Sequence, residues 1–221
     1  MNPFRRHSLA RLDVDHWSAA LQQPWDVQAR DCIAYWAAQQ LPLVVAQQPI
    51  SLAPDRITLG LAAPLRWGRR RLNVQVPISG LLWLDQFPIA SSIGCLLPVD
   101  ARGPWQELCC HLVAAGVELR VYGSYGWQHL TGLDHVHPGS DLDLLMWVPD
   151  ARSADRVVQT LRAAPLAKPR LDGELIFADG SAVAWREWLA WRTGRSECIL
   201  VKRLAGPTLE RKLWPLETCT C

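Results

Sequence analysis

Residues 121–147, VYGSYGWQHLTGLDHVHPGSDLDLLMW, combine a Gly-Ser pair after one apolar segment with two alternating aspartates in the next. The apolar segment, residues 118–121 (ELRV), is a short run of strand-forming character. Gly123 and Ser124 follow it as a break that lets the chain turn sharply. Because a glycine-rich turn lets the backbone approach a phosphate closely, we interpret this pair as a phosphate-binding turn.

Two aspartates mark the second segment, residues 140–148 (SDLDLLMWV). Because side chains alternate along a strand, Asp141 and Asp143 point to one face, and Leu142 and Leu144 point to the other. Neighbouring carboxylates repel each other unless a cation lies between them, and Mg²⁺ prefers oxygen ligands together with substrate phosphates. We therefore predict a Mg²⁺ (or Mn²⁺) site that acts on a polyphosphate. An ordinary strand with one solvated face would show the same alternation.

The order of these features, Gly-Ser after one strand and Asp-x-Asp in the next, resembles the nucleotidyltransferase superfamily that includes polymerase beta. Residues 125–140 separate the two features, a longer gap than is usual in that superfamily, so we expect residues 134–139 (DHVHPG) to form an inserted loop. Histidines on or beside this loop could contact phosphate or a protein partner, although histidines in a polar loop are more often solvated. These are His129, His135 and His137.

The superfamily pattern implies a third carboxylate on a neighbouring strand. Residues 170–177 (RLDGELIF) offer Asp172 and Glu174, which share one strand face. Asp172 fits the alternation best, and Glu174 is the alternative, because Gly173 between them indicates a bulge or a close approach. The catalytic candidates are Asp141, Asp143, Asp172 and Glu174, and the candidate metal ligands are Asp141, Asp143 and Asp172.

The composition is that of a folded globular chain. Of 221 residues, 49% are hydrophobic and 20% are charged, which is enough to bury one large or two small cores. The opening sequence MNPFRRHSLARLD has no apolar run of signal-peptide length, and no segment approaches transmembrane length, so we expect a cytoplasmic protein without membrane contacts. Seven cysteines form no Cys-x-x-Cys pair and no spacing that suits zinc, so we expect reduced thiols.

Most of the 23 basic residues are arginines, while the net charge is only +2. The guanidinium fork suits phosphate, whereas a nearly neutral chain lacks the basic excess of a nucleic-acid-binding protein. We therefore expect a discrete phosphorylated ligand and no nucleic acid. Arg69 and Arg70, in the segment RWGRRR, are substrate-binding candidates, with a solvated turn between strands as the alternative. Lys202, beside the last expected strand, is a further candidate, although an exposed lysine at a strand end is as plausible.

We expect two domains, residues 1–98 and 99–221. The first is β-rich, with helical content limited to residues 17–40. Its expected strands, separated by Pro, Gly and basic turns, are residues 43–46, 57–61, 72–76 and 78–84.

The second domain alternates helices and strands. Its first expected helix is residues 104–115, with Pro104 in the first turn. Its later expected elements are a helix at 153–164, a hairpin turn at 178–180, a Trp-rich helix at 186–192 and a last strand at 197–202. The predicted fold class is α+β, a β-rich N-terminal module followed by a polymerase-beta-like nucleotidyltransferase domain, in which helices flank a mixed sheet.

The chain as a whole resembles one family, the phosphoribosyl-dephospho-coenzyme A transferases, which are the holo-acyl-carrier-protein synthases of malonate decarboxylase. In the first domain the resemblance rests on RRHSLARLD (5–13), PLVVAQQP (42–49) and ITLGLAAPLRWGRRRL (57–72). In the second it rests on VYGSYGWQHLTGLDHVHPGSDLDLL (121–145), RLDGELIFADGSAVAWREW (170–188) and ILVKR (199–203). These segments are specific together, and each alone is weak.

The resemblance implies that a serine hydroxyl of the decarboxylase's apo acyl carrier protein subunit attacks the α-phosphate of 2′-(5″-triphosphoribosyl)-3′-dephospho-coenzyme A, and that pyrophosphate leaves. A metal held by Asp141 and Asp143 suits this chemistry, because it would bridge the triphosphate and stabilise the leaving group. Asp172 or Glu174 would complete a second metal site or act as a base. The turn at Gly123-Ser124 would contact the β- and γ-phosphates.

Two functions of other classes remain open at the level of the sequence. A nucleotidyltransferase that uses ATP or CTP to modify a small molecule, a protein or an RNA would carry the same carboxylates, so the acceptor side of the pocket must separate the two. A non-catalytic binding module would be expected to have lost the Asp-x-Asp pair, whereas both aspartates are present.

Overall fold

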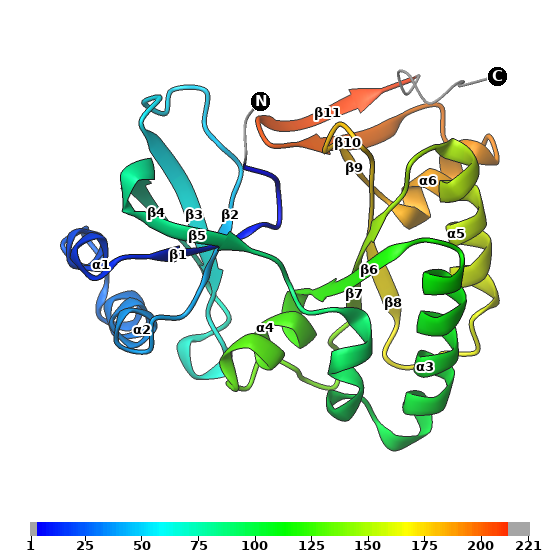
Figure 1. The fold of residues 1–221 in the computed structure, drawn as a ribbon, viewed down its shortest axis with the longest axis horizontal. Coiled ribbons are helices and arrows are strands. Elements are labelled where there is room, and N and C mark those ends of the chain that lie inside the picture. The colour runs from blue at the N-terminus through cyan, green and yellow to red at the C-terminus, as the bar shows by residue number, and fades with distance from the viewer. Residues whose placement is uncertain (1–3, 212–221) are drawn as a thin grey trace. The chain divides into compact units, whose positions relative to one another are not determined.

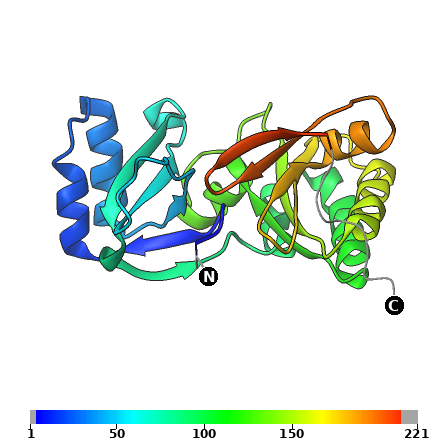
Figure 2. The same cartoon turned by 90° about the horizontal axis from the view of Figure 1, so that it is seen from above.

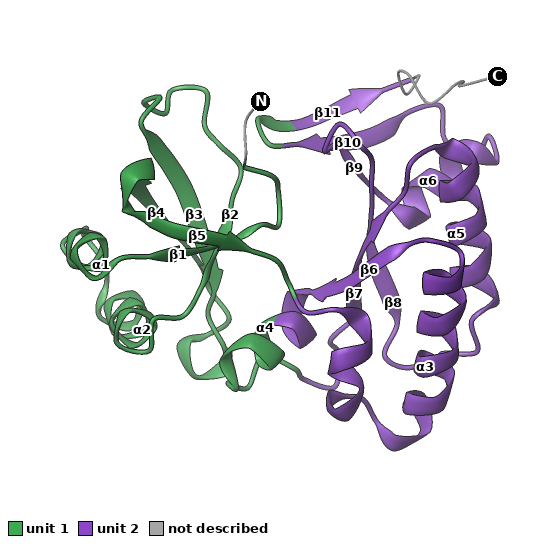
Figure 3. Ribbon diagram, in the orientation of Figure 1, with its two compact units in different colours: residues 1–87, 127–136, 204–206 green, residues 88–126, 137–203, 207–221 purple. Residues whose placement is uncertain are grey.

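The computed structural model of the protein describes residues 4–211. The chain forms two compact units, which Figure 3 shows in different colours. Unit 1 comprises residues 1–87, 127–136 and 204–206, and unit 2 comprises residues 88–126, 137–203 and 207–221. Each unit contains its own β-sheet. The domains expected from the sequence, residues 1–98 and 99–221, stay a prediction.

Unit 1 is built on a five-stranded antiparallel sheet in the order β4-β3-β2-β1-β5. Along β4, Leu72, Val74 and Val76 are buried while the residues between them are exposed, as expected for a strand with one face in a core. Two helices, α1 and α2, lie side by side (Figures 1 and 2). The elements are β1 Leu9–Leu12, α1 Val14–Leu21, α2 Val27–Ala38, β2 Leu43–Val45, β3 Arg56–Ala62, the 3₁₀ turn Leu65–Trp67, β4 Arg71–Pro77, the 3₁₀ turn Ile78–Gly80 and β5 Leu81–Asp85.

The helical content expected at residues 17–40 is present as two helices, of which the first already begins at Val14. Pro24 has no amide hydrogen and disfavours helical geometry in the residue before it, which separates the two helices. Asp26 then starts α2 as its N-cap, since its carboxylate accepts a hydrogen bond from the amide of Ala29.

The strand expected at residues 78–84 begins only at Leu81. The preceding residues form a 3₁₀ turn, and Gly80 in that turn packs against the ring of His16 so closely that an added Cβ would lie 2.3 Å from the ring carbon Cγ. A steric contact of this kind leaves no trace in the local sequence pattern.

Unit 2 is built on a six-stranded mixed sheet in the order β11-β10-β9-β8-β7-β6. The pair β7–β8 is parallel, and the pairs β6–β7, β8–β9 and β9–β10 are antiparallel. The elements from residue 88 onward are the 3₁₀ segment Ala90–Leu96, α3 Val99–Ala114, β6 Glu118–Tyr122, α4 Gly123–Thr131, β7 Leu142–Trp147, α5 Ala151–Ala163, β8 Leu171–Ile176, β9 Ala182–Ala184, α6 Trp185–Arg192, β10 Ile199–Arg203 and β11 Gly206–Glu210. Helix α4 begins in unit 2 and continues from Trp127 in unit 1, and Gly206 at the start of β11 also belongs to unit 1.

Helices α3, α5 and α6 lie side by side along this sheet, in both views of Figures 1 and 2. Helix α5 is the crossover that joins the parallel strands β7 and β8, and its buried residues include Val157, Val158 and Leu161. Strand β8 continues through a tight turn into β9, as the expected hairpin requires. The predicted fold class, α+β with a β-rich first part and a mixed sheet with flanking helices, is confirmed.

Two expectations for unit 2 were wrong. Helix α3 begins at Val99, with Pro98 as its N-cap residue, and Pro104 lies inside the helix instead of in its first turn. The reason is the buried face of the helix, which already includes Ala101 and then continues through Trp105 at helical spacing. In addition, β11 follows β10, whereas the sequence pattern ended with a strand at residues 197–202.

In residues 4–211, no helix combines the length and the apolar character that crossing a membrane requires. The cysteines in this part of the chain are free thiols, as expected, and Cys32 and Cys109 are buried. Cys219 and Cys221 lie outside the described residues.

Candidate active site

Three aspartates of unit 2 lie at the start of two neighbouring strands. Asp143 of β7 is the register partner of Asp172 of β8, so the two carboxylates are on the same side of the sheet. Asp141 directly precedes β7. Both Leu142 and Leu144 are buried, as the alternation predicts. The side chains of Asp141 and Asp172 are 31% and 33% exposed, which leaves both carboxylates open to a ligand.

Arg170 joins these carboxylates. Its Nε atom donates a hydrogen bond to Oδ1 of Asp141 over 3.0 Å, and its Nη2 atom binds the other oxygen of the same carboxylate. The same Nη2 atom lies 3.6 Å from Oδ2 of Asp172. The sequence pattern does not mark Arg170, and the available signal was its position two residues before Asp172, on the same face of an alternating segment.

The electrostatics of the site follow from this contact. Hydrogen bonding from Arg170 lowers the pKa of the Asp141 carboxyl below its ordinary value, and attraction to Arg170 and Arg186 acts in the same direction. The pKa of Arg170 is raised, chiefly by its hydrogen bond to Asp141 and further by attraction to Asp141, Asp172 and Asp143. All three aspartates therefore act on one guanidinium.

Gly123 fits against the carboxylate of Asp143. Its φ is +61°, and a Cβ atom added there would lie 1.9 Å from Oδ2 of Asp143. The expected sharp turn is the start of a helix, because α4 begins at Gly123 immediately after β6. Helix N-termini carry free amide groups and a partial positive charge, so the start of α4 at Gly123 places donors of this kind near Asp143.

Glu174 and Lys202, two further candidates, are partners of each other. Glu174 is 3% exposed, and its Oε1 atom accepts a hydrogen bond from Nζ of Lys202 over 2.8 Å. Gly173, with φ of +135°, packs onto the backbone of Leu144, where a Cβ would lie 2.1 Å from the carbonyl oxygen. This confirms the predicted close approach at Gly173. Of the two acids beside this glycine, Asp172 is accessible and Glu174 is buried.

Arg69 and Arg70 belong to unit 1, whereas the aspartates belong to unit 2. Arg70 forms an ion pair with Asp26, in which Nη2 and Oδ2 lie 2.6 Å apart. This contact, followed by the hydrogen bond from the amide of Ala29, lowers the pKa of Asp26 to about 2. Arg70 thus supports the start of α2, and a substrate-binding role for Arg69 and Arg70 stays a prediction.

His135 is buried, at 5% exposure, so the expectation of a solvated histidine was wrong there. Its ring stacks on Trp127, its Nε2 atom lies 3.2 Å from the hydroxyl of Thr131, and its amide donates to the side chain of Gln128. Burial lowers the pKa of His135 from 6.5 to about 4.

A pH dependence of stability follows from this histidine. The pKa of this histidine is 6.5 in the unfolded chain and about 4 in the folded protein. As the pH falls below 6.5, the unfolded chain therefore binds a proton before the folded protein does. The free energy of unfolding is highest above pH 6.5 and decreases as the pH falls toward 4. We expect His135→Phe to reduce the loss of unfolding free energy between pH 7 and pH 4 by roughly 2–3 kcal/mol. Urea unfolding at both pH values measures this, with the exposed His129→Gln as the control. Equal pH dependence in wild type and His135→Phe would contradict it.

The donor set suits a hard divalent cation in its chemistry, because it consists of carboxylate oxygens. In residues 4–211, however, no three His, Cys, Asp or Glu side chains are grouped closely enough to hold a metal together. Two of the carboxylates converge instead on the cationic side chain of Arg170. The residues fit a metal by donor type and charge, and a metal role for Asp141, Asp143 and Asp172 stays a prediction.

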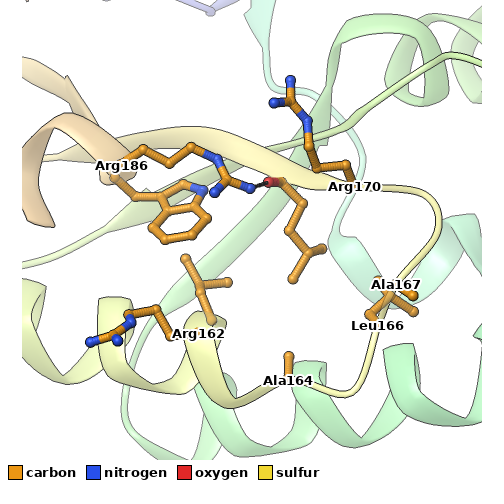
Figure 4. Close-up of a pocket in the computed structure, with 9 residues that line it drawn as sticks. Arg162, Ala164, Leu166, Ala167, Arg170 and Arg186 are labelled. Carbon is orange, nitrogen blue, oxygen red and sulfur yellow. Dashed lines mark hydrogen bonds between the residues drawn. The ribbon is translucent and has the colours of Figure 1, made fainter.

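A pocket of about 280 Å³ lies beside Arg170. Three arginines line it, Arg162 of α5, Arg170 before β8 and Arg186 of α6, together with Trp185 and aliphatic side chains (Figure 4). Arg186 donates a hydrogen bond to the carbonyl of Leu171 over 2.8 Å, and its guanidinium lies 4.2 Å from the centre of the Trp185 ring. The lining contains no acidic side chain.

Comparison with known proteins gives the family. The family model for the phosphoribosyl-dephospho-CoA transferase MdcG N-terminal domain matches residues 5–84, and that for the MdcG C-terminal domain matches residues 88–212. Together with the α+β fold, these matches define a transferase. The chain belongs to the phosphoribosyl-dephospho-CoA transferase (MdcG) family, which confirms the resemblance seen in the sequence.

Two relatives with this name match over more than four fifths of their length. The phosphoribosyl-dephospho-CoA transferase of Xanthomonas campestris pv. campestris (strain 8004) is 34% identical over 210 residues, covering 91% of this chain and 91% of that protein. The protein of the same name from Bradyrhizobium diazoefficiens is 33% identical over 186 residues, covering 84% of this chain and 82% of that protein. No solved structure matches the chain.

Proposed function

We propose that this protein transfers the phosphoribosyl-dephospho-coenzyme A group from 2′-(5″-triphosphoribosyl)-3′-dephospho-coenzyme A to a serine of the apo acyl carrier protein subunit of malonate decarboxylase. The serine oxygen forms the new bond to the α-phosphorus, the bond from that phosphorus to the departing phosphate oxygen breaks, and pyrophosphate leaves. The reaction belongs to the metal-dependent nucleotidyltransferase class. With these partners it takes place in the cytoplasm.

Apart from family membership, the main structural support for this proposal is that carboxylates lie close together at the start of β7 and β8. Asp143 and Asp172 are register partners, and Asp141 and Asp172 both contact Arg170. Like charges so close together repel each other, and in this structure Arg170 supplies the compensating positive charge. A cation-dependent site that acts on a polyphosphate explains why three acids lie on one side of this sheet.

The residues of the chain have separate tasks in this reaction. Gly123 leaves room for the Asp143 carboxylate and, with Ser124, offers amides at the start of α4 to phosphate oxygens. Asp172, which is accessible, is the third carboxylate in preference to Glu174, which is buried against Lys202. An exposed carboxylate of this kind can also accept the proton that the serine hydroxyl loses.

Mg²⁺ or Mn²⁺, held by Asp141, Asp143 and Asp172, would supply positive charge to the triphosphate and to the leaving pyrophosphate. Electrostatic positioning of this kind is the main contribution of proteins to phosphoryl transfer, because the protein itself forms no covalent bond. The pKa of Asp141 is lowered by its hydrogen bond with Arg170, so this carboxylate carries the negative charge that a cation requires.

The substrate is tested by incubating the purified protein with apo acyl carrier protein, Mg²⁺ and one of three donors: triphosphoribosyl-dephospho-coenzyme A, ATP or CTP. We expect pyrophosphate release and a modified carrier only with the first. Modification of the carrier, or of another acceptor, by ATP or CTP would instead support a general nucleotidyltransferase. No reaction with the coenzyme-derived donor would contradict the proposal.

A further inference from the structure

Arg170 lies between two different chemical environments of unit 2. On one side it holds Asp141 through both oxygens of the carboxylate and reaches Asp172 over 3.6 Å. On the other side it lines the pocket together with Arg162 and Arg186. Its side chain is 59% exposed, so little packing holds it in one rotamer. A single side-chain rotation is therefore enough to change its partners.

The pocket is built to accept an anion. It has three guanidinium groups and no carboxylate in its lining. Trp185, also in the lining, is 4% exposed, and its ring carries the guanidinium of Arg186 at 4.2 Å from the ring centre. In Figure 4 the guanidinium of Arg170 points away from Ala164 and Leu166, two other residues of the lining. Clustered guanidinium groups call for acceptor oxygens.

We propose that Arg170 is a displaceable counter-cation, which holds Asp141 and Asp172 until a divalent cation replaces it and then turns into the adjacent pocket to bind phosphate oxygens of the substrate. This inference rests on the metal-dependent reaction proposed above and adds a positioning residue and a phosphate subsite to it. The carboxylates are paired with Arg170 before the divalent cation binds and with the cation afterwards. The guanidinium of Arg170 exchanges the Asp141 carboxylate for phosphate oxygens, which it can also bind through two nitrogen atoms.

The exchange predicts two effects of opposite sign for Arg170→Gln. Without its competitor, the carboxylate site binds Mn²⁺ roughly tenfold more tightly than wild type, because a unit positive charge within 4 Å of the site has been removed. With Mn²⁺ at saturation, inorganic pyrophosphate binds roughly tenfold more weakly, because a charged donor has been lost from the pocket. A purely structural role for Arg170 would weaken both interactions.

Titration calorimetry with the full chain, first with Mn²⁺ and then with pyrophosphate, measures both effects. Arg170→Lys keeps the charge and is expected to remain close to wild type for Mn²⁺. Arg192→Gln is the matched control, because Arg192 holds Asp155 through the same two nitrogen atoms, Nε over 3.0 Å and Nη2 over 2.6 Å. It is expected to leave both affinities unchanged.

Thermal unfolding shows whether the variant is folded and gives a second readout. In EDTA, Arg170→Gln leaves its carboxylates without their bidentate cationic partner and melts below wild type, and Mn²⁺ raises its melting temperature more than it raises that of wild type. Unchanged or weaker Mn²⁺ binding by Arg170→Gln would overturn the inference, as would unchanged pyrophosphate binding. Neither result bears on group transfer by the wild-type protein, which the carrier assay measures separately.

Discussion

Gly123→Ala is expected to lower the rate of group transfer at least about a hundredfold, because displacing a catalytic group by about 1 Å has effects of this size. The new Cβ would lie 1.9 Å from Oδ2 of Asp143, inside van der Waals contact, so the carboxylate must move. The positive φ of +61° adds backbone strain of roughly 1–2 kcal/mol to the folded state. Steady-state transfer rates and urea unfolding of the same preparation separate these two effects.

Gly194→Ala is the matched control for this prediction. Gly194 also belongs to unit 2, has a φ of +69°, and has open space where a Cβ would be placed. It is expected to show the same loss of stability with an unchanged transfer rate. A normal transfer rate of Gly123→Ala would mean that group transfer does not depend on the position of the Asp143 carboxylate beside the start of α4. The proposed site geometry would then be wrong.

Lys202→Met is expected to lower the free energy of unfolding at pH 7 by roughly 3 kcal/mol, because it leaves the buried carboxylate of Glu174 without its cationic partner. The pair joins β8 to β10 across β9, with a distance of 2.8 Å between Nζ and Oε1. Truncating one member of a buried ion pair is costly, whereas replacing both members by apolar groups of similar size is often nearly neutral. Urea unfolding measures the effect.

The double variant Glu174→Met, Lys202→Met is therefore expected to recover most of the stability lost in Lys202→Met. On the sequence alone, Lys202 is instead a candidate for binding substrate. In that case the single variant would unfold like wild type, and its KM for the triphosphoribosyl donor would rise. That pattern would contradict a structural role for the pair.

The order of elements around the site could be predicted from the sequence, because it depends on local periodicity. The alternation of Asp141 to Leu144 is a property of one strand, and the helix, strand and hairpin after it follow from patterns of a few residues each. The break at Gly123 was also visible, although its form, a helix start against Asp143, depends on the pairing of β6 with β7.

Contacts set by strand register could not be predicted in this way. Arg170 meets Asp141 across 29 positions of sequence, and only the parallel pairing of β7 with β8 brings them together. The burial of Glu174 depends on a third strand, β10, which supplies its partner Lys202. His135 lies in a polar segment of the sequence, and its burial follows from Trp127 and Gln128, which pack against it in the folded chain.

The proposed reaction also depends on the carboxylates themselves, and neutral isosteres test them with little change of shape. Asp141→Asn and Asp143→Asn each remove one negative charge from the site. Asp155→Asn is a matched control, because Asp155 also pairs with an arginine through both oxygens and is 30% exposed, close to the 31% of Asp141.

The most direct measurement is the intact mass of apo acyl carrier protein after incubation with Mg²⁺, the triphosphoribosyl-dephospho-coenzyme A donor and each of these proteins. A mass gain equal to the phosphoribosyl-dephospho-coenzyme A group is expected with wild type and with Asp155→Asn, and it is expected to be absent with Asp141→Asn and Asp143→Asn. A carrier that stays unmodified by wild type would contradict the proposed substrate. A full mass gain with both site variants would contradict the carboxylate site.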